Sequence, residues 1–340
     1  MTPTTLVTGA AGFIGMHVCE RLLAQGHRVV GLDNLNDYYD PELKRARLAQ
    51  LEPRDGFEFV RLDLADNPAV DAVFRDRRPE FVVHLAAQAG VRYALDHPFS
   101  YVDSNLRGTA SVLEGCRHHR VRHLVCASSS SVYGGNAKVP FSERDPVDHP
   151  VSLYAATKRS NELMAHSYAH LFGLPVTMLR YFTVYGPWGR PDMAIWKFSD
   201  GLLSSKPIDV FAGGHLSRDF THVDDAADAT VALLGLAPQA AAPGQAPAAA
   251  RPDASWAPFR VLNVGRSDPV TVNELIGHLE RLTGARAIRR ELPMQPGDVE
   301  RTCADPSALR ALTGFEPRVA LADGLASFVD WFRGWRTRSR

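Results

Sequence analysis

Short apolar runs of strand length alternate with amphipathic segments along the first half of the chain. Helical periodicity is found at 13–25, 70–77, 105–119 and 154–172. The apolar runs lie at 4–8, 28–33, 57–63, 81–86, 123–129 and 175–181. Strands that are buried on both faces read as such continuous runs, and they need helical crossovers to run parallel. The rhythm therefore predicts an α/β fold with a doubly wound parallel sheet that helices cover on both faces.

The alternation weakens from about residue 182 onward, where proline and glycine become frequent. We expect a first domain over 1–181 and a smaller C-terminal α/β lobe over 182–340. The stretch 237–258 is mostly alanine and proline, so it can bury little apolar surface to offset the entropy of ordering. It is expected to be a surface insertion, flexible or partly extended. The basic residues from Arg333 to the end predict a solvated terminus.

The charge balance limits the class of partner. The 340 residues include 38 basic and 38 acidic side chains, so no global positive field favours nucleic acid or an anionic membrane. The expected partner is a small molecule. No apolar run reaches the length of about eighteen residues that a membrane span needs, and the start of the chain lacks the pattern of a secretory signal. The cysteines form no CxxC pair, so we expect reduced thiols and a cytoplasmic protein.

A glycine-rich turn directly follows the first apolar run. Gly9, Gly12 and Gly15 form a GxxGxxG pattern, which lets the backbone approach a pyrophosphate at the start of a helix. A tight turn without a ligand is the alternative. Asp33 ends the second run, and its carboxylate can bind the ribose hydroxyls of adenosine but would repel a 2′-phosphate. No arginine follows at 34–36, so NAD is favoured over NADP.

Further cofactor contacts are expected from this turn and from neighbouring strand ends, because a dinucleotide lies along the carboxyl edge of such a sheet. Taken singly, each position is also compatible with an ordinary strand end. The expected residues are Phe13, Ile14, Asp63, Leu64, Leu85, Ala86, Ala87 and Tyr181.

Tyr154 and Lys158 stand four residues apart in a helical segment and therefore share one face. A phenol with an ordinary pKa of about 10 is a poor base at neutral pH, but a nearby ammonium and a nicotinamide cation favour the phenolate. Tyr154 is thus a candidate proton acceptor, and an exposed polar pair is the alternative. The hydroxyl groups of 128–131 end the fifth run and would reach the same edge, unless they form a plain serine-rich loop.

Seven motifs follow one another in the order typical of one enzyme superfamily. They are TGAAGFIG, HLAAQAGVRYALDHP, SSSSVYG, YAATK, RYFTVYGPWGRPDMA, RDFTHVDD and PGDV. With them the chain resembles the extended short-chain dehydrogenase/reductases, which have a Rossmann-type sheet, and within these the UDP-glucuronate 4-epimerases. The segments 35–41 and 189–194 are typical of the glucuronate branch. The resemblance implies tightly bound NAD, a UDP-sugar substrate and a catalytic triad of Ser129, Tyr154 and Lys158.

The chemistry that this resemblance implies needs no second redox substrate. Tyr154 takes the proton of the hydroxyl on carbon 4 while the hydride passes to NAD, which leaves a 4-keto sugar. The ring rotates and the hydride returns to the opposite face, so that UDP-glucuronate and UDP-galacturonate interconvert. Lys158 would hold the nicotinamide ribose and lower the tyrosine pKa, and Ser129 would hydrogen-bond the reacting oxygen.

A uronate substrate makes decarboxylation a possible side reaction, because the 4-keto intermediate is a β-keto acid that loses carbon dioxide readily. Hydroxyl groups of Ser130, Ser131 and Thr183, with Arg190 nearby, are expected to pin the carboxylate through directional hydrogen bonds. The galactose epimerases carry asparagine where this chain has Thr183. For Arg190 a solvated loop charge is the alternative.

The resemblance also suggests how the rest of the substrate is held. Arg92 and Arg218 are expected to clamp the UDP diphosphate, since guanidinium groups match phosphate oxygens. Asp298 matches the position of the family residue that contacts the uridine ribose. The alternatives are a surface ion pair for either arginine, with Asp219 as the partner of Arg218, and a plain turn carboxylate for Asp298.

Other functions remain open at this point. A UDP-glucuronate decarboxylase shares the first oxidation, and a non-catalytic NAD-binding module would share the cofactor site. A 4,6-dehydratase is disfavoured because that branch has an Asp-Glu pair where this chain has Ser130 and Ser131. The resemblance also implies that the helices at 105–119 and 154–172 pair with their copies in a homodimer. The cysteines and histidines between 116 and 126 match no metal-ligand spacing, so no metal is expected.

Overall fold

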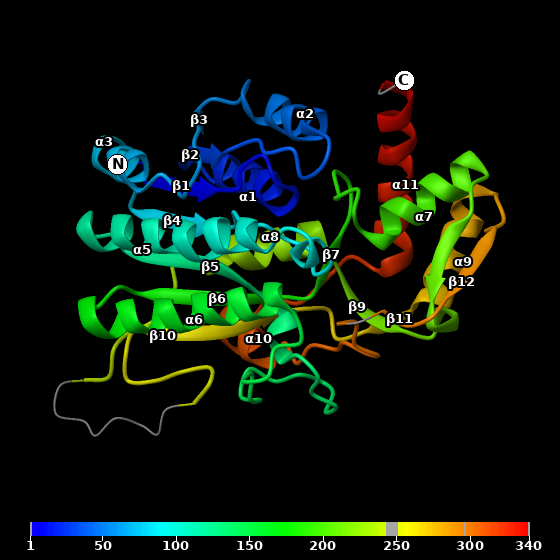
Figure 1. Cartoon of the computed structure of the whole chain (residues 1–340). Helices are drawn as coiled ribbons and strands as arrows, with labels where there is room; N and C mark the ends of the chain where they lie inside the picture. Colours follow the sequence, from blue (N-terminus) through cyan, green and yellow to red (C-terminus); the bar gives the residue numbers. More distant parts are fainter. Residues whose placement is uncertain (1, 243–250, 296, 339–340) are drawn as a thin grey trace.

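A seven-stranded parallel sheet lies at the centre of the fold (Figure 1). The structure is a computed structural model, and it describes residues 2–242, 251–295 and 297–338. Across the sheet the strands are β10 (Phe259–Val264), β6 (Val176–Tyr181), β5 (His123–Ser129), β4 (Phe81–His84), β1 (Thr4–Thr8), β2 (Arg28–Asp33) and β3 (Phe57–Arg61). Each neighbouring pair runs parallel. The predicted doubly wound parallel sheet is confirmed, and its strand order reverses between β1 and β4, where such sheets bind ligands.

Helices cover both faces because successive side chains of a strand point to opposite faces. Leu6 of β1 belongs to a core completed by α3 (Asn67–Arg77), α5 (Gly108–His118) and α6 (Leu153–Phe172). The next residue, Val7, belongs to a core completed by α1 (Phe13–Ala24), α8 (Val223–Ala232) and α10 (Ser307–Thr313). α2 (Pro41–Leu51) packs beside α1. The turn before α1 and the start of α6 are thereby held at the same edge of the sheet.

A second lobe has its own apolar core. A three-stranded sheet contains β7 (Thr183–Tyr185), β9 (Ser217–His222) and β11 (Pro269–Thr271), and a two-stranded one contains β8 (Ile208–Phe211) and β12 (Arg289–Leu292). The helices of this lobe are α7 (Ala194–Ser204), α9 (Val272–Thr283) and α11 (Leu321–Arg338). Shorter helical turns occur in both parts of the fold, and they are α4 (Pro98–Tyr101), Tyr93–Leu95, Ser130–Tyr133 and Ala212–Gly214.

The first domain takes elements from beyond residue 181. β10 pairs with β6 at the edge of the central sheet, and α8 packs against α1. The expected division into 1–181 and 182–340 therefore does not coincide with the edge of the sheet. The chain returns to the first domain after it has begun the second lobe.

The bounds of several predicted strands agree with the structure to the residue. β1, β2 and β5 coincide with the runs at 4–8, 28–33 and 123–129. α2 was not predicted, because its buried residues include the charged side chains of Lys44 and Arg47, which interrupt the apolar pattern of the helix. The predicted helix at 105–119 starts inside a π-helical turn, Val102–Arg107, that continues into α5.

The described parts of the expected insertion and tail make contacts with helices of the fold. Residues 243–250 of the insertion lie outside the described residues. In its described part, the indole of Trp256 donates a hydrogen bond to Nδ1 of His170 on α6 at 3.0 Å. Of the tail that was expected to be solvated, residues 333–338 belong to α11, where Arg336 donates to the hydroxyl of Ser204 at 2.6 Å, and residues 339–340 lie outside the described residues. Within the described ranges, none of the helices has the length and hydropathy that crossing a bilayer requires.

Candidate functional site

A cavity of about 1000 Å³ extends from the carboxyl ends of the central strands to the second lobe. Every residue that the sequence analysis assigned to a site lines this cavity. The expected cofactor residues are Gly9, Gly12, Phe13, Ile14, Gly15, Asp33, Asp63, Leu64, Leu85, Ala86, Ala87 and Tyr181. The expected catalytic and substrate residues are Arg92, Ser129, Ser130, Ser131, Tyr154, Lys158, Thr183, Arg190, Arg218 and Asp298. The fold thus brings together groups that are spread over most of the chain.

The glycine turn between β1 and α1 packs closely against the segment after β4 and leaves the start of α1 without a side-chain cap. Gly9 has a φ of +74°, and a Cβ atom there would stand 2.8 Å from the backbone nitrogen of Ala86. α1 begins after Gly12, and no side chain caps its first N–H groups. These N–H groups and the positive end of the helix can therefore bind an anion. The turn fits the diphosphate of a dinucleotide.

Asp33 at the end of β2 faces this turn. Its carboxylate accepts hydrogen bonds from the backbone N–H groups of Ala11 at 3.2 Å and Leu35 at 2.9 Å. Burial raises the pKa of Asp33, and these hydrogen bonds oppose the rise. Asp63, just beyond β3, accepts a hydrogen bond of 3.0 Å from the side-chain amide of Asn34. The two carboxylates line the part of the cavity where ribose hydroxyls would need acceptors.

Two buried cations on α2 were not predicted as part of the site. Lys44 lines the cavity and donates to the backbone and side-chain oxygens of Asn36 at 2.8 and 2.6 Å. Arg47 is fully buried and donates to the carbonyl of Ala11 at 3.1 Å and the phenol of Tyr39 at 2.6 Å. Burial lowers the pKa of both side chains. Their spacing of three, on the face that also buries apolar residues of α2, is the signal that could have revealed them.

Tyr154 and Lys158 lie in the first turns of α6. Ser152 caps this helix by accepting a hydrogen bond of 3.1 Å from the backbone N–H of Ala155. Lys158 is buried, and its Nζ donates to the carbonyl oxygen of Ala127 in β5 at 2.9 Å. This hydrogen bond fixes the ammonium beside the end of β5, on the helix face that it shares with the phenol.

Ser129 ends β5 and lines the same cavity. Its hydroxyl accepts from the backbone N–H of Ser131 and donates to the Ser131 hydroxyl, both at 3.1 Å. Behind it, Arg180 donates two hydrogen bonds of 2.9 Å to Glu162, which also accepts from Ser128 at 2.6 Å. Burial would raise the pKa of Glu162, but the Arg180 charge and these hydrogen bonds hold it below its usual range. The buried pair fixes the ends of β5 and β6 against α6.

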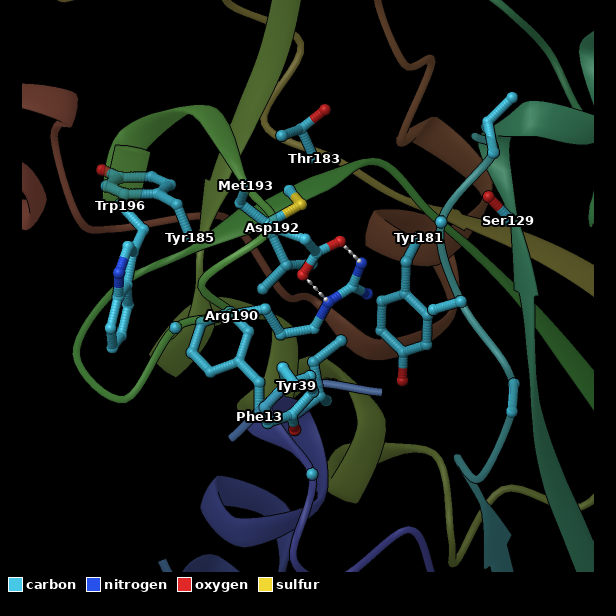
Figure 2. A pocket seen from close by; sticks show the side chains of 18 of the residues that line it. Phe13, Tyr39, Ser129, Tyr181, Thr183, Tyr185, Arg190, Asp192, Met193 and Trp196 are labelled. Atoms are coloured by element: carbon cyan, nitrogen blue, oxygen red, sulfur yellow. Dashed lines mark hydrogen bonds and ion pairs between the residues drawn. The ribbon is translucent and has the colours of Figure 1, made fainter. Parts of the chain in front are cut away.

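Arg190 reaches the cavity from the loop that follows β7. Figure 2 shows its guanidinium paired with Asp192, with Nε donating to Oδ1 at 2.9 Å and Nη2 to Oδ2 at 2.6 Å. The phenol of Tyr38 donates to the same carboxylate at 3.4 Å. Arg190 is therefore a partnered side chain of the cavity wall and not a solvated loop charge. Asp192 and Tyr38 were not predicted as site residues, although they lie in the two segments that resemble the glucuronate branch.

Arg92 and Arg218 approach each other across Asp298. Their Nη2 atoms lie 3.4 and 4.0 Å from the two carboxylate oxygens of Asp298. The guanidinium of Arg92 also lies 4.9 Å from the ring centre of Phe211. Asp219, the alternative partner of Arg218, instead accepts backbone hydrogen bonds of 2.8 to 3.0 Å from three other residues. Two cations thus share one carboxylate at this end of the cavity, which leaves an excess of positive charge.

Tyr181 and Thr183 flank the end of β6. The ring of Tyr181 lines the cavity, but its hydroxyl is hydrogen-bonded to that of Thr230 on α8 at 2.6 Å. Any contact of Tyr181 with a cofactor therefore involves its ring or backbone. Thr183, the first residue of β7, also lines the cavity.

Known proteins are similar to this chain in sequence and in fold. The model of the NAD dependent epimerase/dehydratase family matches residues 5–245. A Rhizobium meliloti protein described as a probable UDP-glucuronate 4-epimerase is 49% identical over 327 residues, 96% of each chain. Bacillus cereus UDP-glucuronic acid 4-epimerase in complex with UDP-glucuronic acid and NAD has a TM-score of 0.86 at 34% identity, covering 98% of this chain and 99% of that one. Thermus thermophilus UDP-glucose 4-epimerase with NAD has a TM-score of 0.82 at 32% identity, covering 97% and 99%. The chain therefore belongs to the NAD-dependent epimerase/dehydratase family.

Proposed function

We propose that the chain is an isomerase, a UDP-glucuronate 4-epimerase that interconverts UDP-glucuronate and UDP-galacturonate. The observation that carries this proposal is the single cavity that Ser129, Tyr154 and Lys158 share with the glycine turn and the loop of Arg190. The names of the Rhizobium and Bacillus relatives support the choice of a uronate as substrate.

NAD is the cofactor that the site fits. We assign its diphosphate to the glycine turn and the start of α1, its adenosine ribose to Asp33, and its nicotinamide ribose to Lys158. When bound, NAD accepts the hydride from carbon 4 of the sugar and returns it to the opposite face, so that no second redox substrate is consumed. The remaining contacts are assigned to Phe13, Ile14, Asp63, Leu64, Leu85, Ala86, Ala87 and Tyr181, which line the same part of the cavity.

Tyr154 acts on the hydroxyl at carbon 4. Its phenolate accepts the hydroxyl proton as the ketone forms, and it returns the proton when the alcohol is restored with inverted configuration. Lys158, whose ammonium is fixed by the carbonyl of Ala127, favours the phenolate through its charge. Ser129 donates a hydrogen bond to the oxygen that becomes the ketone. Between the half-reactions the sugar turns over, and a cavity of about 1000 Å³ gives it room.

The diphosphate of the substrate stays bound while the sugar turns. We assign this task to Arg92 and Arg218, because guanidinium groups bind phosphate oxygens in two-point contacts. Asp298 lies between them and is assigned to the uridine ribose. The excess positive charge of this cluster favours the dianionic diphosphate.

The carboxylate of the substrate must be held so that the 4-keto intermediate keeps its carbon dioxide. Loss of carbon dioxide requires the carbon–carboxyl bond to stand perpendicular to the plane of the ketone. We assign the hydroxyl groups of Ser130, Ser131 and Thr183 and the guanidinium of Arg190 to hold the carboxylate away from that geometry. Charge-assisted hydrogen bonds suit this role because they are strong and directional.

Proton NMR of the purified protein with UDP-glucuronate tests the proposed function. UDP-galacturonate should form without added reductant. A deuterium atom placed on carbon 4 should remain there in the product, because the proposed cycle returns the same hydride. A dominant UDP-pentose signal would identify a decarboxylase, and the absence of any product would identify a non-catalytic module.

We further propose that the protein acts in the cytoplasm as a homodimer. All four cysteines are buried and unpaired, which suits a reducing compartment. α5 and α6 lie side by side on one face of the sheet (Figure 1), and α6 exposes Leu163 by 55% and Leu171 by 66%. A Leu163→Arg variant should therefore sediment as a monomer, whereas Leu312→Arg on α10 should not. Identical sedimentation of both variants as dimers would exclude an interface through α6.

A further inference from the structure

The ion pair of Arg190 with Asp192 has no role in the reaction cycle described above. Asp192 occupies one edge of the guanidinium, formed by Nε and Nη2 (Figure 2). Among the residues that the structure describes, no other hydrogen bond to this guanidinium is found. Since a guanidinium has five N–H donors, three remain, two on Nη1 and one on Nη2. One N–H of Nη1 and the remaining N–H of Nη2 form the second edge, which has the shape that binds a carboxylate in two-point contact.

Asp192 is itself held in place. Its side chain and that of Arg190 are each only 25% exposed, and the phenol of Tyr38 donates to its Oδ2 at 3.4 Å. Burial would raise the pKa of Asp192, but the Arg190 charge keeps it below its usual range, so the side chain stays ionised. Burial and the nearby Asp192 raise the pKa of Tyr38 to about 12, so the phenol stays a donor at neutral pH.

We propose that Asp192 is a specificity-determining positioning residue, which holds one edge of Arg190 so that the other edge faces the carboxylate of the substrate. This inference rests on the proposed function. Without Asp192, the guanidinium could rotate about the bonds of its long side chain and meet the substrate in several geometries. With Asp192, backed by Tyr38, one geometry is selected before the substrate binds.

The orientation matters because of how charge moves when carbon dioxide is lost. In the 4-keto intermediate, the bond from carbon 5 to the carboxyl carbon breaks, and its electron pair forms an enolate on the ketone oxygen. The carboxylate leaves as neutral carbon dioxide, the enolate takes up a proton at carbon 5, and return of the hydride gives a UDP-pentose. A cation fixed at the carboxylate stabilises the charge there and loses this interaction as the bond breaks. A well-positioned Arg190 therefore raises the barrier to decarboxylation.

Affinity and product partition should respond differently to loss of Asp192. Its negative charge competes with the substrate carboxylate for one guanidinium, so removing the charge leaves more positive potential for the substrate. Removing it also frees the guanidinium to rotate. The KM for UDP-glucuronate should therefore not rise, while the share of decarboxylated product should.

An Asp192→Asn variant, purified and loaded with NAD, tests this inference by NMR quantification of UDP-pentose against UDP-galacturonate. The ratio should rise about tenfold, since small losses of alignment change rates by factors of this size, with no increase in KM. Tyr38→Phe removes only the hydrogen bond to Asp192, so it should shift the ratio in the same direction by a smaller factor. The matched control is Asp253→Asn. Arg251 pairs with Asp253 through the same atoms and the same spacing, at 3.1 and 3.2 Å, away from the cavity.

The outcomes separate this inference from the proposed function. If the wild-type protein epimerises and both cavity variants keep its product ratio, the inference is overturned and the proposed function stands. If kcat falls or KM rises without a change in the ratio, Asp192 has a structural role only, and the inference is again overturned. A wild-type protein that forms no UDP-galacturonate overturns both. A raised ratio in Asp192→Asn and Tyr38→Phe, with Asp253→Asn unchanged, supports the inference.

Discussion

Arg47 donates two hydrogen bonds, at 3.1 and 2.6 Å, to the carbonyl oxygen of Trp188 in the loop that carries Arg190. The same guanidinium donates to Gly189 at 3.0 Å and to Ala11 in the glycine turn. The backbone φ of Trp188 is 64°, a value that residues other than glycine rarely adopt. One buried side chain therefore connects the glycine turn to the loop of Arg190 and holds that loop in an unfavourable backbone conformation.

Replacing Arg47 should destabilise the protein. In Arg47→Met the carbonyls of Ala11, Trp188 and Gly189 would lose their buried donor, and each such loss costs about 1–3 kcal/mol. Urea unfolding should show a loss of about 3–5 kcal/mol in the free energy of unfolding. The control is Arg45→Met on the same helix, whose side chain is 59% exposed and pairs only with Glu42. Equal stability of the two variants would contradict the structural role of Arg47.

Tyr154→Phe should retain NAD but lose turnover. The phenyl ring preserves packing in the cavity but cannot accept a proton, and loss of acid–base catalysis lowers rates by about 10²-fold or more. Turnover of UDP-glucuronate and the NAD released on denaturation should both be measured. Tyr168→Phe is the control, because Tyr168 lies on the same helix and donates only to Glu114 at 2.6 Å. Unchanged turnover in Tyr154→Phe would refute its role as the proton acceptor.

The sequence was sufficient to predict residues at strand ends. Gly12 and Ser129 lie far apart in the chain, but each follows or ends an apolar strand. Because parallel strands end at one edge of the sheet, recognising the strands was enough to place both residues in one cavity. The motifs that resemble a known family supplied the residues from the loops, such as Arg190, that strand patterns could not.

Contacts between segments far apart in the sequence could not be predicted in this way. Arg47 on α2 and Trp188 are 141 residues apart, and Tyr38 and Asp192 are 154 apart. Each contact depends on how two distant segments meet in space, and neither local segment contains that information. For the same reason the place of β10 in the central sheet could not be predicted. Its apolar run does not show that the chain has returned from the second lobe.

Acid should destabilise the fold through three buried histidines. Burial lowers the pKa of His17 to about 4, of His84 to about 3 and of His123 to about 4. Below about pH 6.5 the unfolded chain takes up a proton at each histidine that the native state still excludes, so stability is complete above this pH and falls below it. The slope is about 1.4 kcal/mol per pH unit for each histidine.

Urea unfolding between about pH 7 and about pH 5 measures this loss, which should amount to several kcal/mol. A His84→Gln variant should show a shallower slope, because glutamine does not titrate. His84 is bonded between the hydroxyls of Thr8 and Thr109 at 2.7 and 3.1 Å, so the variant is compared by its slope and not by its absolute stability. A flat profile over this range would show that the native state accommodates the protonated histidines.

Arg190→Ala should change both affinity and product. Without the guanidinium the substrate carboxylate loses a charge-assisted contact worth about 1.5–3 kcal/mol, so KM for UDP-glucuronate should rise about tenfold or more. The fraction of UDP-pentose should rise as well, because the cation assigned to the carboxylate no longer opposes the loss of its charge. The rise in KM distinguishes this variant from Asp192→Asn, in which the cation remains. Arg251→Ala, at the matched ion pair outside the cavity, should leave KM and the product ratio unchanged, and an unaltered ratio in Arg190→Ala would count against restraint of the carboxylate by this side chain.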